Sequence, residues 1–197
     1  MRKSILLSLA AIAALASLVF ADATENIRKA PELAFKIPGK PDQLLSQYRG
    51  KVVALEFIFT TCPHCQAASK YMTKMQADYG ARGLQVIDVA INPNADLLVE
   101  NFAKDMQVNF PVGWATADQM EAFMGFGNAR YVVPQLALID RQGNIHWQTP
   151  ATSNDPAWEK VMNQDAIRQH IEQLLAQPAT ASAHRPPTKL AANKKPS

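Results

Sequence analysis

Cysteine is scarce in this sequence of 197 residues, which holds two, in the motif Cys62-Pro63-His64-Cys65. No cysteine lies directly after the apolar segment near the N-terminus, so a lipid attached to cysteine at that point is excluded. The motif closely follows an apolar run, residues 52–59, that is typical of a buried strand. A chain whose whole cysteine complement is one C-x-x-C pair at a strand end is predicted to carry out dithiol chemistry there.

Histidine is also rare, and the four histidines form no cluster with metal-ligand spacing. His146 and Trp147 follow a predicted hairpin turn, where a structural role is favoured over a ligand role. His170 falls on a predicted helix and His184 near the C-terminus. The sequence therefore predicts no metal and no cofactor other than the redox-active cysteine pair. We assign a set of methionines and phenylalanines to the core and to groove lining rather than to a metal site: Met72, Met75, Met120, Met124, Phe102, Phe123 and Phe126.

A strongly basic domain is absent, although the whole chain has a net charge of +3. The last 20 residues, 178–197, contain four basic residues and no acidic one, and they are rich in proline and alanine. This composition predicts a disordered, solvated tail, with a weak contact to anionic lipid as the alternative. Residues 24–177 are left with a charge of about −2. A nucleic-acid partner is therefore not expected.

The N-terminus predicts export. Residues 1–3 include two basic side chains, residues 4–20 are apolar, and Ala21-Asp22-Ala23 offers small residues at the positions that a signal peptidase reads. We expect a signal peptide over residues 1–23 and a mature chain that starts at Asp22 or Thr24. An uncleaved anchor is the alternative, because the apolar stretch is near the lower bound of the roughly 17 to 25 residues that span a bilayer. The bacterial periplasm, where disulfides persist, is the predicted compartment.

Residues 24–177 are long enough for one domain with its own core. Apolar periodicity predicts a helix-like segment over 42–48, strands over 51–59, 84–90 and 108–114, helices over 65–80, 94–106 and 117–124, a hairpin over 135–147 and one last helix opened by Pro156. Strands that alternate with helices predict an α/β sandwich with a mixed central sheet flanked by helices.

This order of elements resembles the thioredoxin superfamily over Pro31 to Gln177. The resemblance rests on a strand, the Cys62-Pro63-His64-Cys65 motif, a helix, and then Val133-Pro134 at the start of a hairpin strand. It implies a thioredoxin-like fold in which Pro134 is preceded by a cis peptide bond and faces the cysteines. Pro63 and Val133 would then line the substrate groove. The alternative for Pro134 is an ordinary proline at a strand start.

Spacing identifies the branch of the superfamily. Cys65 and Pro134 are 69 residues apart, which leaves room for an extra helix and strand over residues 96–114. Such an insertion is similar to that of the TlpA- and ResA-like periplasmic thiol:disulfide oxidoreductases, and residues 50–57 look like their first active-site strand. The resemblance implies cysteine-containing exported proteins as partners, and a membrane thiol reductase or oxidase that recycles the disulfide.

The scaffold and the active-site residues favour opposite directions of electron flow. The scaffold resembles reductants, for example those of cytochrome c maturation. However, Thr61 stands where these reductants usually have tryptophan, and the Pro63-His64 dipeptide and Val133 look more like the oxidant DsbA. The scaffold thus favours a reductant, while the active-site residues favour an oxidant.

The two cysteines are predicted to have different roles. Cys62 precedes a helix, so the positive end of the helix dipole and unpaired N–H groups favour its thiolate and make it the attacking nucleophile. Cys65, one turn further on, would resolve the mixed disulfide. His64 could stabilise the Cys62 thiolate, which would raise the reduction potential. The alternative is that His64 is a solvent-facing residue without a role.

Glu56 is the remaining candidate catalytic residue. It lies six positions before Cys62 in an otherwise apolar strand. The resemblance implies that an acidic residue here is buried behind the cysteines and relays a proton to or from Cys65, and burial would raise its pKa. The alternative is a carboxylate on a solvated sheet face or paired with a lysine.

Two other functions remain as alternatives. Cys62, Cys65 and His64 could hold Cu(I), as in Sco-type copper proteins, although those space their cysteines more widely and add a distant histidine. A thiol peroxidase is also conceivable, because peroxiredoxins share the scaffold. Their attacking cysteine follows a threonine by three positions and a proline by seven, where this chain has Phe59 and Leu55.

Overall fold

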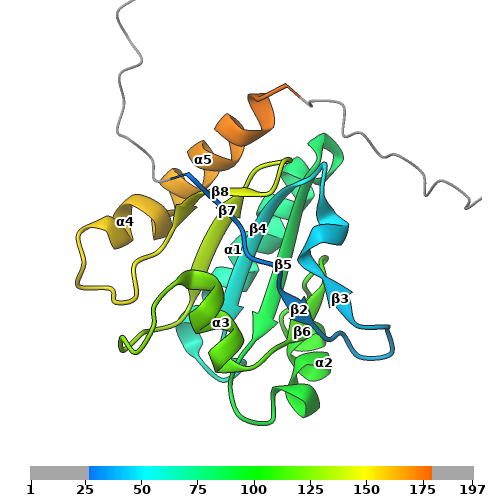
Figure 1. Ribbon diagram of the computed structural model, residues 1–197. Helices are drawn as coiled ribbons and strands as arrows, with labels where there is room; N and C mark the ends of the chain where they lie inside the picture. The colour runs from blue at the N-terminus through cyan, green and yellow to red at the C-terminus, as the bar shows by residue number, and fades with distance from the viewer. Residues whose placement is uncertain (1–26, 179–197) are drawn as a thin grey trace, which may run out of the picture.

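A six-stranded mixed sheet positions the cysteines, in a computed structural model that describes residues 27–178 (Figure 1). In sheet order, the strands are β1 (Arg28–Lys29), β8 (Asn144–Gln148), β7 (Gln135–Ile139), β4 (Val52–Ile58), β5 (Leu84–Ala90) and β6 (Val112–Trp114). β4, β5 and β6 run parallel, whereas β7 and β8 are antiparallel to their neighbours. A separate pair, β2 (Ala34–Phe35) and β3 (Gln43–Leu44), is also antiparallel. The predicted mixed α/β sheet is thereby confirmed.

Helices cover both faces of this sheet (Figure 1). One face packs against α1 (Pro63–Tyr79), α2 (Ala95–Asp105), α4 (Ala157–Met162) and α5 (Gln164–Ala176). The other face packs against α3 (Ala117–Met124), the β2–β3 pair and the 3₁₀ turn η1 (Leu45–Tyr48). A second 3₁₀ turn, η2 (Gly80–Arg82), follows α1. The thioredoxin-like three-layer arrangement follows from these two apolar layers.

The central strand β4 is buried along its whole length, as expected for a strand covered on both faces. Successive side chains point to opposite faces, so Val52, Ala54 and Ile58 join the core under α1, while Leu55 and Phe57 join the core under α3. By the same alternation Glu56 projects into the layer between the sheet and α1. A carboxyl group is therefore placed inside an apolar core.

Helix α1 begins at the cysteine motif for local reasons. Cys62 is its N-cap, and Pro63 occupies the first turn, where a missing N–H costs nothing. The helix ends at Gly80, as the sequence predicts. Its buried side includes Cys65, Ser69 and Met72, which recur at helical spacing and face the sheet.

Several boundaries differ from the sequence-based expectations. The last helix is interrupted at Asn163, whose extended backbone and side-chain carbonyl cap a new helix, α5, by accepting hydrogen bonds from two N–H groups. Residues 42–48 form β3 and a 3₁₀ turn rather than one helix-like segment. The strand expected over 108–114 begins only at Val112, directly after Pro111, which cannot donate to a strand ladder.

The predicted terminal segments lie outside the described residues. This applies to the signal peptide over residues 1–23 and to the tail beyond Pro178. Between residues 27 and 178, no helix combines the length and the apolar character that crossing a bilayer requires.

Candidate functional site

The two cysteines lie at the junction of β4 and α1, with different exposure. Cys62 is half-buried and Cys65 is buried, and both are free thiols. The N–H of Phe59 donates to the Sγ of Cys65 at 3.4 Å. Burial raises the pKa of Cys65 well above its ordinary value, with the neighbouring Cys62 and Glu56 adding to the effect and the Phe59 N–H opposing it. Cys62 is the accessible sulfur, whereas Cys65 is held as a neutral thiol.

The Val133–Pro134 peptide bond is cis, which confirms the prediction from the sequence. Both residues precede β7, which is paired antiparallel to the cysteine-bearing strand β4. Both also line a cavity next to α1, together with His64. Chain segments 70 residues apart in sequence are thus brought to one site.

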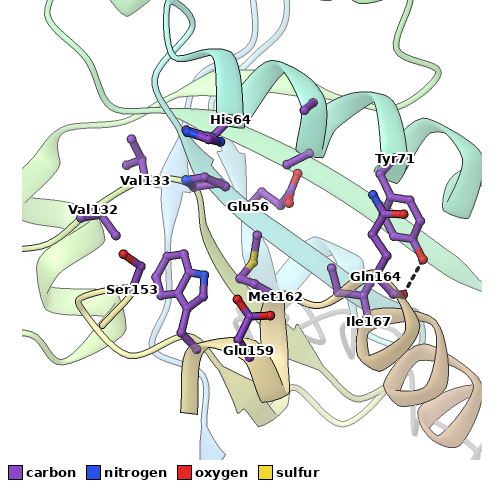
Figure 2. A pocket seen from close by; sticks show the side chains of 14 residues that line it. Glu56, His64, Tyr71, Val132, Val133, Ser153, Glu159, Met162, Gln164 and Ile167 are labelled. Carbon is purple, nitrogen blue, oxygen red and sulfur yellow. Dashed lines mark hydrogen bonds between the residues drawn. The ribbon is translucent and has the colours of Figure 1, made fainter. Parts of the chain in front are cut away.

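The cavity has a volume of about 600 Å³ and lies between α1, the segment before β7, and helices α4 and α5 (Figure 2). Its lining is mainly apolar: Glu56, His64, Ala67, Ala68, Tyr71, Val132, Val133, Pro134, Ser153, Trp158, Glu159, Met162, Gln164 and Ile167. The hydroxyl of Tyr71 donates to the carbonyl oxygen of Gln164 at 2.6 Å and joins α1 to the start of α5 (Figure 2). The sequence did not reveal the α4 wall, since nothing near the cysteine motif indicates that Trp158 and Met162 fold back beside it.

Glu56 is fully buried, so it does not lie on a solvated sheet face as the alternative reading of the sequence required. Its neighbour in register on β5 is Asp88, another buried carboxyl and not a lysine. Burial, followed by the charge of Asp88 and a hydrogen bond with it, raises the pKa of Glu56 well above its ordinary value. Glu56 also contributes to the cavity wall, so it lies between the cavity and Asp88.

Asp88 and Ser69 are site residues that the sequence analysis missed. The hydroxyl of Ser69, on α1, donates to Oδ2 of Asp88 at 2.6 Å. Burial raises the pKa of Asp88 to about 7, although hydrogen bonds from Ser69 and Glu56 act in the opposite direction. The signal was present, because Asp88 is the only charged residue in the apolar run 84–90, as Glu56 is in its own strand.

The remaining predicted site residues differ in their surroundings. His64 is exposed and its ring lies at the cavity (Figure 2), and its effect on the Cys62 thiolate stays a prediction. Pro63 is exposed and does not line the cavity. The structure thus brings Glu56, His64, Val133 and Pro134 together, with Pro63 at the helix start beside them.

His146 and His170, the other histidines within residues 27–178, have structural contacts, as the sequence predicts for His146 and Trp147. His146 Nε2 lies 2.9 Å from Oδ2 of Asp140. The Trp147 ring stacks on His170 at a centroid distance of 4.0 Å. The assigned methionines and phenylalanines are buried in the two cores, apart from the partly buried Phe126. Within residues 27–178, no three His, Cys, Asp or Glu side chains are grouped so that they could hold a metal ion.

Comparison with known sequences identifies a family and several relatives. The sequence pattern of the AhpC/TSA family matches residues 28–148. The thiol-disulfide oxidoreductase ResA of Geobacillus thermodenitrificans is 29% identical over 130 residues, which cover 66% of this chain and 67% of the relative. The ResA of Geobacillus kaustophilus is 28% identical over the same length, with the same coverage.

Solved structures give a matching result. A Chlorobium tepidum protein described as thiol:disulfide interchange protein DsbE has a TM-score of 0.62 and 27% identity, and the match covers 78% of this chain and 99% of that one. A second Chlorobium tepidum structure, a thiol:disulfide interchange protein of the thioredoxin family, has a TM-score of 0.61 at 22% identity, covering 79% and 99% of the two chains. The second likeness supports the fold alone.

Proposed function

Because this chain belongs to the AhpC/TSA family and is a thiol-disulfide oxidoreductase with a thioredoxin-like fold, we propose that it reduces disulfides in exported proteins. Apocytochromes that await haem attachment are one class of such substrates. The proposed site of action is the periplasm, where a membrane thiol reductase would return the oxidised protein to its dithiol form. The periplasmic location rests on the signal sequence in residues 1–23.

The environment of Cys65 is the main observation in favour of a reductant. A C-x-x-C protein is a strong oxidant when its surroundings stabilise the reduced form, usually as a thiolate. Here Cys65 is fully buried and a carboxyl group lies behind it, so a thiolate at this position is disfavoured. His64, which the sequence offered as a stabilising group, is exposed, and solvent weakens electrostatic interactions at an exposed site. Neither residue supplies the stabilised thiolate that makes a C-x-x-C protein a strong oxidant, and this favours the reducing direction.

The proposed reaction has two steps, one for each cysteine as nucleophile. The Cys62 thiolate attacks one sulfur of the substrate disulfide, and the other substrate sulfur leaves as a thiolate that takes a proton from water. Cys65 then gives its proton to the carboxylate of Glu56 behind it and attacks the Sγ of Cys62. The Cys62–Cys65 bond forms, the bond from Cys62 to the substrate breaks, and the second substrate sulfur leaves. The substrate gains two electrons, and the protein is left with one disulfide.

The cavity beside α1 is proposed to accommodate substrate residues next to the disulfide. Its apolar wall of Trp158 and Met162 suits an extended segment with apolar side chains, while Glu159 provides one charge at the rim. Val133 and Pro134 would lie along the segment at the side nearer the cysteines.

A trapping experiment tests this function. Without Cys65 the mixed disulfide cannot be resolved, so we expect Cys65→Ser to accumulate covalent adducts with exported cysteine proteins. The adducts are detected as bands from periplasmic extract that disappear on reduction, and mass spectrometry identifies the attached proteins. The double variant with both cysteines replaced by serine is the control and should give no band. If Cys65→Ser also recovers no adduct, the proposed function is wrong.

A further inference from the structure

The second buried carboxyl, Asp88, has no place in the reaction as described so far. It lies on β5, directly beside Glu56 of β4, in a parallel register that pairs the two residues. Both carboxyls project into the layer between the sheet and α1, because Val86 and Ala90, two positions before and after Asp88, belong to the core under that helix. Two acidic groups in adjacent positions of a fully buried layer are costly unless they share protons.

The residues around Glu56 and Asp88 offer these carboxyls few hydrogen-bond partners. Leu136 of β7 is the neighbour of Glu56 on one side, and Val112 of β6 is the neighbour of Asp88 on the other. Neither oxygen of Glu56, nor Oδ1 of Asp88, forms a hydrogen bond of ordinary geometry with any group in residues 27–178, the other carboxyl included. A proton held between the carboxyls pairs one oxygen of each, because the protonated group donates to the other.

Ser69 determines which carboxyl carries the charge. Its hydroxyl donates to Oδ2 of Asp88 and stabilises Asp88 as the anion, so the shared proton is favoured on Glu56. Ser69 lies one helical turn after Cys65 on the buried side of α1. The same helix face therefore presents the resolving thiol and the group that orients the carboxyl pair.

We propose that Asp88 is a positioning residue for disulfide exchange: it shares a proton with Glu56 across β4 and β5 and so sets the pH above which Glu56 has lost this proton and can accept that of Cys65. This inference rests on the proposed function, because it assigns a role in the second step of that reaction. The elevated pKa of Glu56 agrees with it, since the charge of Asp88 contributes to that elevation. The other titratable groups that line the site are Cys62, Cys65, His64, Tyr71 and Glu159.

A two-phase kinetic experiment isolates the step. The dithiol protein is mixed in a stopped-flow instrument with an aromatic disulfide whose thiolate is coloured. The first thiolate reports attack by Cys62 and depends on reagent concentration, whereas the second reports attack by Cys65 within the mixed disulfide and does not. The rate of the second phase is measured against pH, so the proton acceptor for Cys65 appears as an inflection.

Asp88→Asn is expected to move this inflection to lower pH by at least about one unit, because the like charge is gone and the new amide can donate to Glu56. The first phase should keep its rate. Glu56→Gln should slow the second phase and remove the inflection. Asp140→Asn is the matched control, because it also neutralises a buried aspartate. Asp140 follows β7, at the end of the strand away from Pro134 and the cavity, so the pH profile of this variant should equal that of the wild type. An inflection that stays in place or rises in Asp88→Asn overturns the proposal.

A second measurement applies even where a variant does not fold. Carbon NMR of labelled carboxyl groups in the wild-type dithiol protein should show Glu56 and Asp88 responding together in two common pH steps. Independent single-step titrations of the two carboxyls would overturn the shared proton. If neither coloured phase appears, exchange itself is absent and the proposed function fails. If both appear and the second is indifferent to Asp88, only the present inference fails.

Discussion

Replacing Cys62 by serine should abolish disulfide exchange, lowering the rate by at least about a thousandfold, as is usual when a covalent nucleophile is removed. The reason is its position: Cys62 is the half-buried cysteine at the helix N-terminus, while Cys65 is enclosed by the core. Cys65 cannot substitute for it, because burial raises the pKa of that thiol and removes the reactive thiolate at neutral pH. The measurement is the rate at which the variant reduces a disulfide-bonded peptide under single-turnover conditions.

Cys65→Ser is the matched control for this prediction. It removes the same number of sulfur atoms but leaves the first attack intact, so it should still form the mixed disulfide at the wild-type rate. Comparable first-phase rates in the Cys62→Ser protein would mean that the roles of the two cysteines are reversed. Cys62→Ser should keep the wild-type urea midpoint, because Cys62 is half-buried and not linked to another cysteine in this structure, whereas Cys65→Ser should lower the midpoint, because a hydroxyl replaces a thiol in the core.

The free energy of unfolding should fall as the pH rises from about 5 to 8. The carboxyls of Glu56 and Asp88 have raised pKa values in the folded protein, so the folded state binds more protons than the unfolded chain over this range. The stabilisation from these carboxyls is therefore complete below their pKa values in the unfolded chain, about 4, and is lost as the pH rises through their pKa values in the folded protein. The expected loss is on the order of 2 kcal/mol, measured as urea unfolding at several pH values.

The variants separate this effect from other titrations. Asp88→Asn should flatten the decline, because one of the two buried acids is gone. In Asp140→Asn the slope between pH 5 and 8 should remain, since burial is outweighed there by hydrogen bonds from Asn144 that lower the pKa of Asp140, which titrates in acid. His170, whose pKa is lowered by burial, makes stability increase with pH below about 6.5 and is common to all variants. A wild-type profile as flat as that of Asp88→Asn would show that the carboxyl pair is not buried as described.

The strands and helices next to the cysteines could be predicted because each has a clear local pattern. β5 has the bounds expected from its apolar run, and α3 is found where predicted. The interruption of the last helix was missed, since Asn163 lies within an apolar helical repeat and its capping role depends on an extended backbone. β1 and β2 have two residues each, too short for a periodic signal, and exist because a neighbouring strand or segment offers an edge.

The parts of the candidate site that depend on local sequence were predicted, whereas the contacts between distant segments were not. The cysteine motif, Glu56 and the cis bond before Pro134 could be read from local pattern and resemblance. The pairing of Glu56 with Asp88 could not, because it depends on the register of two strands 32 residues apart. The α4 wall of the cavity likewise arises from tertiary packing alone. Contacts of this kind are set by the fold rather than by local propensity.

The reduction potential of the Cys62–Cys65 couple tests the central claim most directly. The mature protein is equilibrated in glutathione or dithiothreitol buffers of known potential, free thiols are trapped with an alkylating reagent, and the reduced fraction is fitted as a two-electron couple. The buried, carboxyl-backed Cys65 predicts a value near or below about −220 mV, in the range of reductants. A value near about −120 mV, the range of strong protein oxidants, would contradict the proposed direction of electron flow.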